Sequence, residues 1–321
     1  MSASERADAR ARRRVSRRYL PPPRTWVRSA VEFQHGFRRV RSRADADDAM
    51  TLALTEMLAV RAPTERELQD CVTSRDADGM PIELQSRPYM ALRARALSVH
   101  VCRVTSLVHV FLEHNQLTSL PDCIGDLTAL THLDMSHNRL RTLPDSIGRL
   151  TALETFGLEF NCLDALTDEI GQLTALQNLW VNNNLMRALP DRVGDLTNLR
   201  WLTAANNRLT AIPDSIGRLT ALTTLDLGLN QLTALPDSIG NLTDLIYFNV
   251  CYNQLTALPE SIGRMTALTH LYLYCNFLTA LPDSIALMNE RIFISFQNNP
   301  MSADAVAAAR ALLGPHRVLL A

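Results

Sequence analysis

The segment LTAIPDSIGRLTALTTLDLGLN at residues 209–230 is followed, one residue later, by a close copy, LTALPDSIGNLTDLIYFNVCYN at residues 232–253. Both copies end in Asn, and aligning the chain on this residue shows a repeat of 23 residues. The period is kept without insertion or deletion at Asn115, Asn138, Asn161, Asn184, Asn207, Asn230, Asn253, Asn276 and Asn299. A fixed period of this kind is typical of proteins that stack one small unit, so the sequence predicts a solenoid.

Each repeat contains two kinds of segment. Before the Asn, apolar residues such as Leu225 and Leu227 alternate with variable ones, which is the period of a β-strand. After the Asn comes Leu-Pro-Asp-Ser-Ile-Gly-x-Leu, as at residues 235–242, where Pro and the acid favour a short helical start. The frame L-x-x-L-x-L-x-x-N-x-L is the leucine-rich-repeat pattern. We therefore expect an α/β leucine-rich-repeat solenoid, a curved horseshoe with a parallel concave sheet and short helices or 3-10 turns on its convex side.

The repeated Asn has a predicted role of its own. It follows the strand at the point where the backbone turns inward, and its amide can both donate and accept hydrogen bonds. We expect it to satisfy peptide groups that the turn would otherwise bury without partners.

The strand positions that face away from the core carry the variation between repeats. They lie six, four and two residues before each Asn, with the residue directly before the Asn beside them, and they hold most of the Trp and Tyr of the chain. Aromatic side chains are enriched in protein interfaces, so we expect a partner-binding concave face. Its candidate residues are Phe111, Phe160, Trp180, Trp201, Tyr247, Tyr252, Tyr272, Tyr274 and Phe293, with His109 and His132. The alternative is that the rings only stabilise contacts between neighbouring strands.

The candidate rings fall into two predicted clusters. Phe160, Trp180 and Trp201 form the first, and the second contains Tyr247, Tyr252, Tyr272, Tyr274 and Phe293. Nine strands at the usual spacing give a face roughly 40 Å long, which suits a folded protein better than a small metabolite.

Charge is distributed unevenly along the chain. Residues 1–43 contain 13 Arg and 3 acidic residues, a net charge of +10, whereas residues 44–321 have a net charge of −11. Such a composition favours a disordered Arg-rich arm at 1–43. The arm could bind nucleic acid or an anionic membrane, serve as an address, or act as an export leader.

The flanks of the repeats suggest capping segments. We expect a helical N-terminal cap and a degenerate first coil at 44–106, about nine repeats at 107–300, and a C-terminal cap helix within 301–321 that starts after Ser302. The six cysteines show no CxxC pair and no flanking disulfide cluster: Cys71, Cys102, Cys123, Cys162, Cys251 and Cys275. This favours an intracellular, cytoplasmic location, with export into a host cell or nuclear targeting as alternatives.

Over about residues 97–300 the repeat resembles the Ras-group intracellular leucine-rich-repeat proteins, including Scribble-like and plant relatives, which share the L-P-x-x-I-G-x-L segment. The resemblance implies a scaffold in signal transduction that binds small GTPases, phosphatases or other signalling proteins. Bacterial effectors are similar in architecture, and some carry a ubiquitin ligase with a Cys-x-Asp motif. Here Cys162-Leu163-Asp164 spells that motif inside a repeat, so we do not expect a ligase.

The sequence contains no phosphate-binding loop and no recognisable nucleophile and base, so we expect no enzyme, no catalytic residues, no cofactor and no metal. We therefore expect a monomeric, non-catalytic interaction scaffold that binds a protein partner on its concave face. The alternative function is an effector-like or adaptor protein whose Arg-rich arm acts on nucleic acid or anionic membrane.

Overall fold

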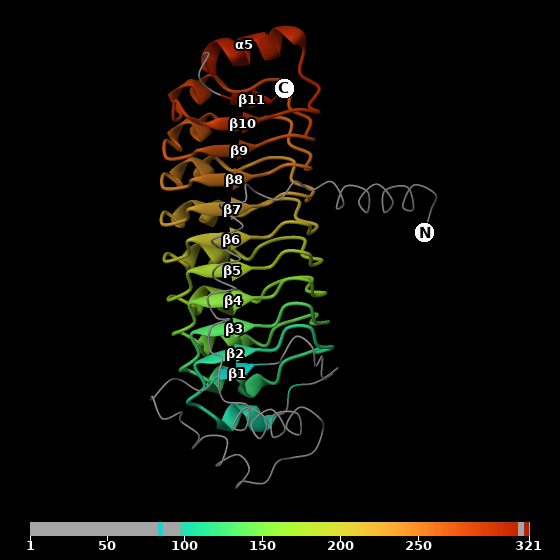
Figure 1. Cartoon of the computed structure of the whole chain (residues 1–321), viewed down its shortest axis with the longest axis vertical. Coiled ribbons are helices and arrows are strands. Elements are labelled where there is room, and N and C mark those ends of the chain that lie inside the picture. Colours follow the sequence, from blue (N-terminus) through green and yellow to red (C-terminus); the bar gives the residue numbers. More distant parts are fainter. Residues whose placement is uncertain (1–82, 86–96, 98, 314–317, 321) are drawn as a thin grey trace, which may run out of the picture. The chain divides into compact units, whose positions relative to one another are not determined.

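The computed structural model of the chain describes residues 83–85, 97, 99–313 and 318–320. The Arg-rich arm and the helices expected between residues 44 and 82 lie outside this part. Within the described residues the strands form one parallel sheet in sequence order, as Figure 1 shows. The strands are β1 (Glu83–Gln85), β2 (His109–Phe111), β3 (His132–Asp134), β4 (Thr155–Gly157), β5 (Asn178–Trp180), β6 (Trp201–Thr203), β7 (Thr224–Asp226), β8 (Tyr247–Asn249), β9 (His270–Tyr272), β10 (Phe293–Ser295) and β11 (Val318–Leu320).

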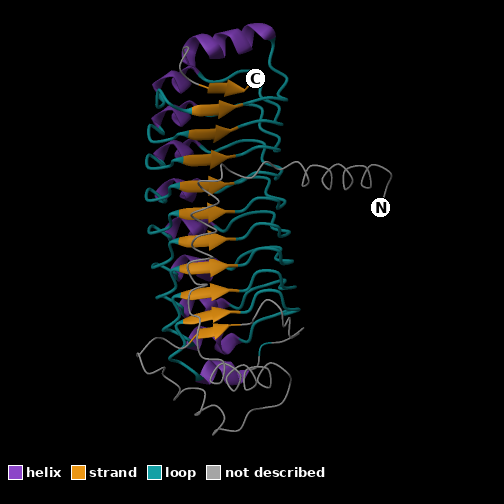
Figure 2. Cartoon of the chain, in the orientation of Figure 1, coloured by secondary structure: helices purple, strands orange, loops and turns teal. Residues whose placement is uncertain are grey.

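Short 3-10 segments lie on the other side of the coils from the sheet (Figure 2). They are η1 (Val99–Arg103), η2 (Asp122–Asp126), η3 (Asp145–Arg149), η4 (Asp168–Gln172), η5 (Asp191–Asp195), η6 (Asp214–Arg218), η7 (Asp237–Asn241), η8 (Glu260–Arg264) and η9 (Asp283–Leu287). In η6 the preceding Pro213 has φ −70°, and Asp214 opens the segment, as the sequence predicts. The solenoid with a parallel sheet and 3-10 turns is therefore confirmed.

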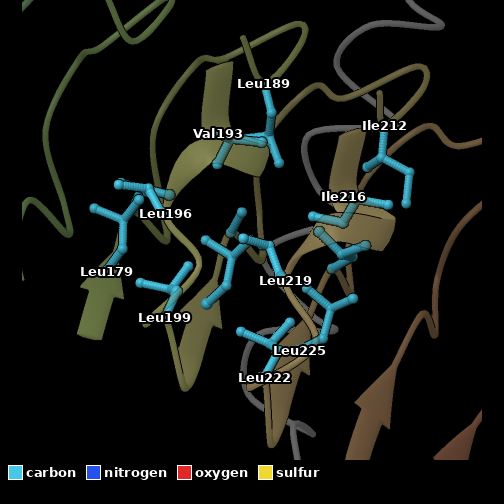
Figure 3. Packing of buried hydrophobic residues seen from close by; sticks show 14 of the residues in the cluster. Leu179, Leu189, Val193, Leu196, Leu199, Ile212, Ile216, Leu219, Leu222 and Leu225 are labelled. Atoms are coloured by element: carbon cyan, nitrogen blue, oxygen red, sulfur yellow. The ribbon is translucent and has the colours of Figure 1, made fainter. Parts of the chain in front are cut away.

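The core runs between the sheet and the 3-10 segments. The middle residue of each strand of the repeats points inward, so Leu202 of β6 and Leu225 of β7 are fully buried. Leu179, Leu199 and Leu222 join them from neighbouring coils, and Figure 3 shows these side chains interleaved with Val193 and Ile216 of the 3-10 segments. Because each coil shares its apolar residues with the next, no single repeat has a core of its own.

The Asn ladder binds each coil to the one before it. The side-chain amide of Asn207 donates to the carbonyl of Val181 at 2.9 Å, 26 residues earlier, and to that of Ala204 at 3.1 Å in its own turn. Its Oδ1 accepts from the N–H of Met186 at 3.1 Å. The predicted role of the Asn is confirmed, and its bonds both close its own turn and join that turn to the preceding coil.

The 3-10 segments approach one another very closely. A Cβ placed on Gly217 would lie 2.5 Å from the carbonyl oxygen of Ser238 in the next coil. Only a residue without a side chain allows this approach. The strands form one uncurled sheet, whereas the sequence analysis expected a curved horseshoe.

The described ends depart from the 23-residue period. β1 pairs with β2 in a register that joins residues 26 apart, and β11 pairs with β10 in one that joins residues 25 apart. The sequence analysis predicted neither strand. It did predict the helix before β11: α5 (Ala303–Leu313) begins after Ser302, whose Oγ accepts from the N–H of Ala305 at 3.1 Å. Ala309 and Leu313 of α5 belong to the buried core.

One pair of cysteines forms a disulfide that the sequence analysis did not predict. Cys102 of η1 and Cys123 of η2 form a disulfide, with Cα atoms 5.7 Å apart. The two 3-10 segments are neighbours in the stack and keep the 23-residue offset, and the two cysteines are 21 residues apart in sequence. The pair occurs in one place and does not recur with the repeat, so no spacing motif in the sequence marks it. Among the other described cysteines, Cys162, Cys251 and Cys275 are free.

In the part of the chain that the structure describes, no helix is both long enough and apolar enough to span a bilayer.

Candidate protein-binding face

We call the solvent side of β2 to β10, with the residue directly before each ladder Asn, the sheet face. In β5 and β9 the first and third residues are partly exposed while the middle residue is buried, as the strand period predicts. The candidate residues of the sequence analysis all lie on this face or at its edge.

The second predicted group of rings is one connected cluster. We define the ring cluster as Tyr247, Tyr252, His270, Tyr272, Tyr274 and Phe293, from β8, β9, β10 and the turns after β8 and β9. Tyr272 lies at its centre, with ring centroids 5.4 Å from Tyr247, 6.4 Å from Tyr274 and 5.6 Å from Phe293. His270, which the sequence analysis did not select, bridges Tyr272 and Phe293 at 6.3 and 6.1 Å.

Not every ring of the cluster faces solvent. Tyr247 is only 7% exposed, so it supports its neighbours rather than offering contact area. Cys251 beside it is fully buried, and burial raises the pKa of its thiol to about 12. A thiol with that pKa stays protonated at neutral pH and is a poor nucleophile. This part of the face therefore suits packing and not covalent chemistry.

The first predicted group of rings is arranged differently. Phe160 stacks on His137 with ring centroids 4.3 Å apart, and His137 stacks on His114 at 4.2 Å. These residues precede ladder Asn residues and have positive φ angles of 53° to 59°. Within the described residues neither Trp180 nor Trp201 makes a ring contact with Phe160. The single diagonal cluster expected from the sequence is replaced by a ring stack at the edge of the face and two separate indoles.

His109 and His132 lie at the N-terminal end of the face. Their rings meet edge to face at 4.7 Å, and His109 is 6.1 Å from the ring of Phe111. The Nδ1 atom of His132 also lies 2.9 Å from the hydroxyl of Thr131. No three side chains of the His, Cys, Asp or Glu type come together as a metal site in the described part of the chain.

The same face also carries carboxylates that the sequence analysis did not select as partner-binding residues. The strand period places them there: Glu113, Asp134, Glu159 and Asp226. None of the ten arginines between residues 107 and 299 occupies a sheet-face position. Burial raises the pKa of Glu113 to about 7, and burial also raises the pKa of Glu159. The face is thus aromatic and acidic.

Two family profiles match this chain. The profile for a leucine-rich repeat region matches residues 187–289, and the profile for two copies of leucine-rich repeats matches residues 105–148. Together with the fold, they show that the chain is a leucine-rich-repeat protein. The Ras-group and Scribble-like subtype stays a resemblance. No curated protein sequence matches the chain.

Solved structures with the same fold include ectodomains of plant receptors. The plant peptide hormone receptor RGFR1 in complex with RGF2 is 28% identical with a TM-score of 0.60, covering 64% of this chain and 34% of the receptor chain. The LRR ectodomain of the Arabidopsis receptor kinase HAESA in complex with an IDA peptide hormone ligand is 32% identical with a TM-score of 0.56, covering 64% of this chain and 36% of that one. The matched region is about a third of each receptor chain.

Proposed function

We propose that this chain is a non-catalytic protein-interaction module that binds a protein partner on its sheet face. Leucine-rich-repeat proteins generally mediate protein–protein interactions, and the receptors named above are complexed with peptide hormones. The choice of the sheet face rests on the structure of this chain alone. A role in intracellular signalling, with a small GTPase, a phosphatase or another signalling protein as partner, belongs to the same proposal.

The observation that carries the proposal is the ring cluster. Tyr272, Tyr274 and Phe293 are only partly buried, although their rings pack together over β9, the turn after it and β10. Burying large rigid side chains in an interface gains affinity with little loss of conformational entropy. Framework packing does not require them, since the core is complete beneath the strands. A partner that covers these rings is the simplest account of their position.

The arrangement also argues against catalysis as the main activity. The most deeply buried thiol on the face, Cys251, is held protonated by its surroundings. The carboxylates Asp134 and Asp226 each accept a backbone N–H bond within their own turn, from Ser136 at 2.8 Å and from Gly228 at 3.0 Å. These bonds fix the side chains in place, which favours recognition over proton transfer.

The proposal is tested by identifying partners through proximity labelling with the full chain and then measuring the affinity of purified partner for three variants. Tyr272→Ala and Trp180→Ala are each expected to weaken binding at least tenfold, as central interface aromatics do. Arg149→Ala is the control, because Arg149 lies on the 3-10 side, where it pairs with Asp126 at 3.4 Å. A partner that binds both sheet-face variants with wild-type affinity would overturn the proposal.

A further inference from the structure

The Asn ladder is incomplete at the N-terminal end of the described stack. The side-chain amide of Asn138 donates to the carbonyl of Leu112, 26 residues earlier, and its Oδ1 accepts a backbone N–H of the same preceding coil. In the described part of the chain, the amide of Asn115 donates only within its own turn, and its buried Oδ1 has no hydrogen-bond partner. The described ladder bonds therefore do not reach residues 99–107, which we call the first coil.

A disulfide joins the first coil to the next one at a contact that the following coils make through a glycine. Because η1 and η2 keep the 23-residue offset, Cys102 occupies the position of Gly125, and Cys123 occupies that of Ser146. A Cβ placed on Gly125 would collide with the carbonyl oxygen of Ser146 and would lie 2.9 Å from its Cβ. In the following coils this contact therefore has room for one side chain, whereas the first coil brings two side chains to it.

Two thiols need more room at this contact than a disulfide does. Sulfur atoms that share a bond lie close together, whereas atoms that are not bonded keep their van der Waals separation. Reduction therefore pushes η1 away from η2. The first coil then keeps the pairing of β1 with β2 and the packing of Val101, Val104 and Leu107 in the core, without the ladder bonds that join the later coils.

We propose that the disulfide between Cys102 and Cys123 is a redox-controlled latch on the first coil. In the oxidised protein the latch holds η1 against η2. In the reduced protein the first coil opens locally and uncovers the apolar end of the core, while the coils that the Asn ladder joins stay folded. The latch is open in a reducing compartment and closed in an oxidising one. This inference does not depend on the proposed function.

Cys123 is the cysteine that a reductant reaches. It is partly exposed and lines an open hollow on the 3-10 side, whereas Cys102 is buried. The thiolate of a small dithiol attacks the Sγ atom of Cys123, the S–S bond breaks, and the Sγ atom of Cys102 leaves with the electron pair and takes up a proton. The second thiol of the reductant then closes a disulfide within the reductant and releases Cys123 as a thiol. Two electrons and two protons thus pass from the dithiol to the protein.

Hydrogen–deuterium exchange of the full chain, oxidised and then reduced with dithiothreitol, tests the inference. The N–H groups of Val104 and Leu107 bond within the first coil, to the carbonyls of Val101 and Val104 at 3.0 and 3.1 Å. They should exchange at least about tenfold faster after reduction, while the N–H groups of β5 to β8 should exchange at an unchanged rate. Alkylation and mass spectrometry show whether the bond is broken. A disulfide that dithiothreitol leaves intact in the folded chain, or equal exchange of the first coil in the two states, would overturn the inference.

Matched variants separate the bond from the crowding at the contact. Cys123→Ser keeps a side chain at both positions, so its first coil should exchange fast with or without dithiothreitol. Cys102→Gly combined with Cys123→Ser restores the pair found at Gly125 and Ser146, so its first coil should exchange slowly in both conditions.

Cys162→Ser removes a free cysteine of a later coil and is the control, because it should respond to dithiothreitol as wild type does. Circular dichroism shows whether each variant is folded. Slow exchange in Cys123→Ser would also overturn the inference, because the coil would then stay closed without the bond. Fast exchange in the double variant would overturn it too, since crowding of two side chains would not be what opens the coil.

Discussion

The side-chain amide of Asn184 donates a hydrogen bond to the backbone carbonyl of Leu158, in the preceding coil, at 2.9 Å. Its Oδ1 accepts from the N–H of Leu163, also in the preceding coil, at 3.0 Å. The Asn184 side chain is only 5% exposed. It therefore gives a hydrogen-bond partner to one backbone N–H and one backbone carbonyl that are shielded from water. The same geometry returns at each following ladder Asn, so stability is linked from coil to coil.

The first prediction concerns this ladder. Asn184→Leu should destabilise the protein by on the order of 1–3 kcal/mol, because two buried backbone groups of the preceding coil lose their partner. Urea denaturation followed by circular dichroism measures the change. Asn241→Leu, at an exposed position of η7, is the control and should change the unfolding free energy by less than about 0.5 kcal/mol. Equal denaturation midpoints for Asn184→Leu and wild type would contradict the role given to the ladder.

Features that recur with the 23-residue repeat could be predicted from the sequence, and most features that occur once could not. The solenoid and the role of Asn184 followed from spacing, because each depends on contacts that recur at a fixed offset, whereas the helix after Ser302 followed from a local capping residue. The 26-residue register of β1 could not be predicted, because the chain leaves its period there, and the disulfide between Cys102 and Cys123 could not, because this pair of cysteines occurs once and does not recur with the repeat.

The candidate site was predictable only in part. Strand periodicity identified which side chains face away from the core, and Tyr272 lies where it was expected. Ring partners depend on side-chain torsions and on the turn before each Asn, which is why Phe160 stacks on His137 and not beside Trp180. The period placed Glu159 on the face, but it was not selected as a binding residue because the selection followed aromatic side chains.

The second prediction concerns the close approach on the 3-10 side. Gly217→Ala should destabilise the protein by about 1–3 kcal/mol, because the new Cβ would lie 2.5 Å from the carbonyl oxygen of Ser238 and 2.7 Å from its Cβ. Thermal unfolding measures the change. The last coil offers a natural comparison, since Ala286 of η9 occupies the glycine position and no further 3-10 segment follows η9 among the described residues. Ala286→Gly should therefore change stability much less, and an equal loss in both variants would show that packing between coils is not the cause.

The third prediction concerns backbone strain at the edge of the sheet face. Leu229 has φ 57°, in a region that costs a residue with a branched side chain roughly 1 kcal/mol and that Asn adopts more readily. Leu229→Asn should therefore raise the unfolding free energy by about 0.5–1 kcal/mol, in line with the Asn residues at the same position in other repeats, such as Asn206. Leu229→Ala is the control, because Ala keeps a Cβ and should bring no gain. A lower stability for Leu229→Asn than for Leu229→Ala would mean that packing outweighs strain.

The fourth prediction concerns pH. Burial raises the pKa of Glu159 above its value in the unfolded chain, so the folded protein holds this proton more tightly. The contribution to stability is fully present below the unfolded pKa and is lost as pH rises through the folded pKa. Glu159→Gln stays neutral and keeps an oxygen that can accept from Asn182. The variant should therefore match wild type at low pH and become the more stable of the two as pH rises to neutral and above. Urea denaturation of both proteins at a series of pH values measures the difference, and a difference that is constant across the series would show that the carboxylate is not buried as the structure places it.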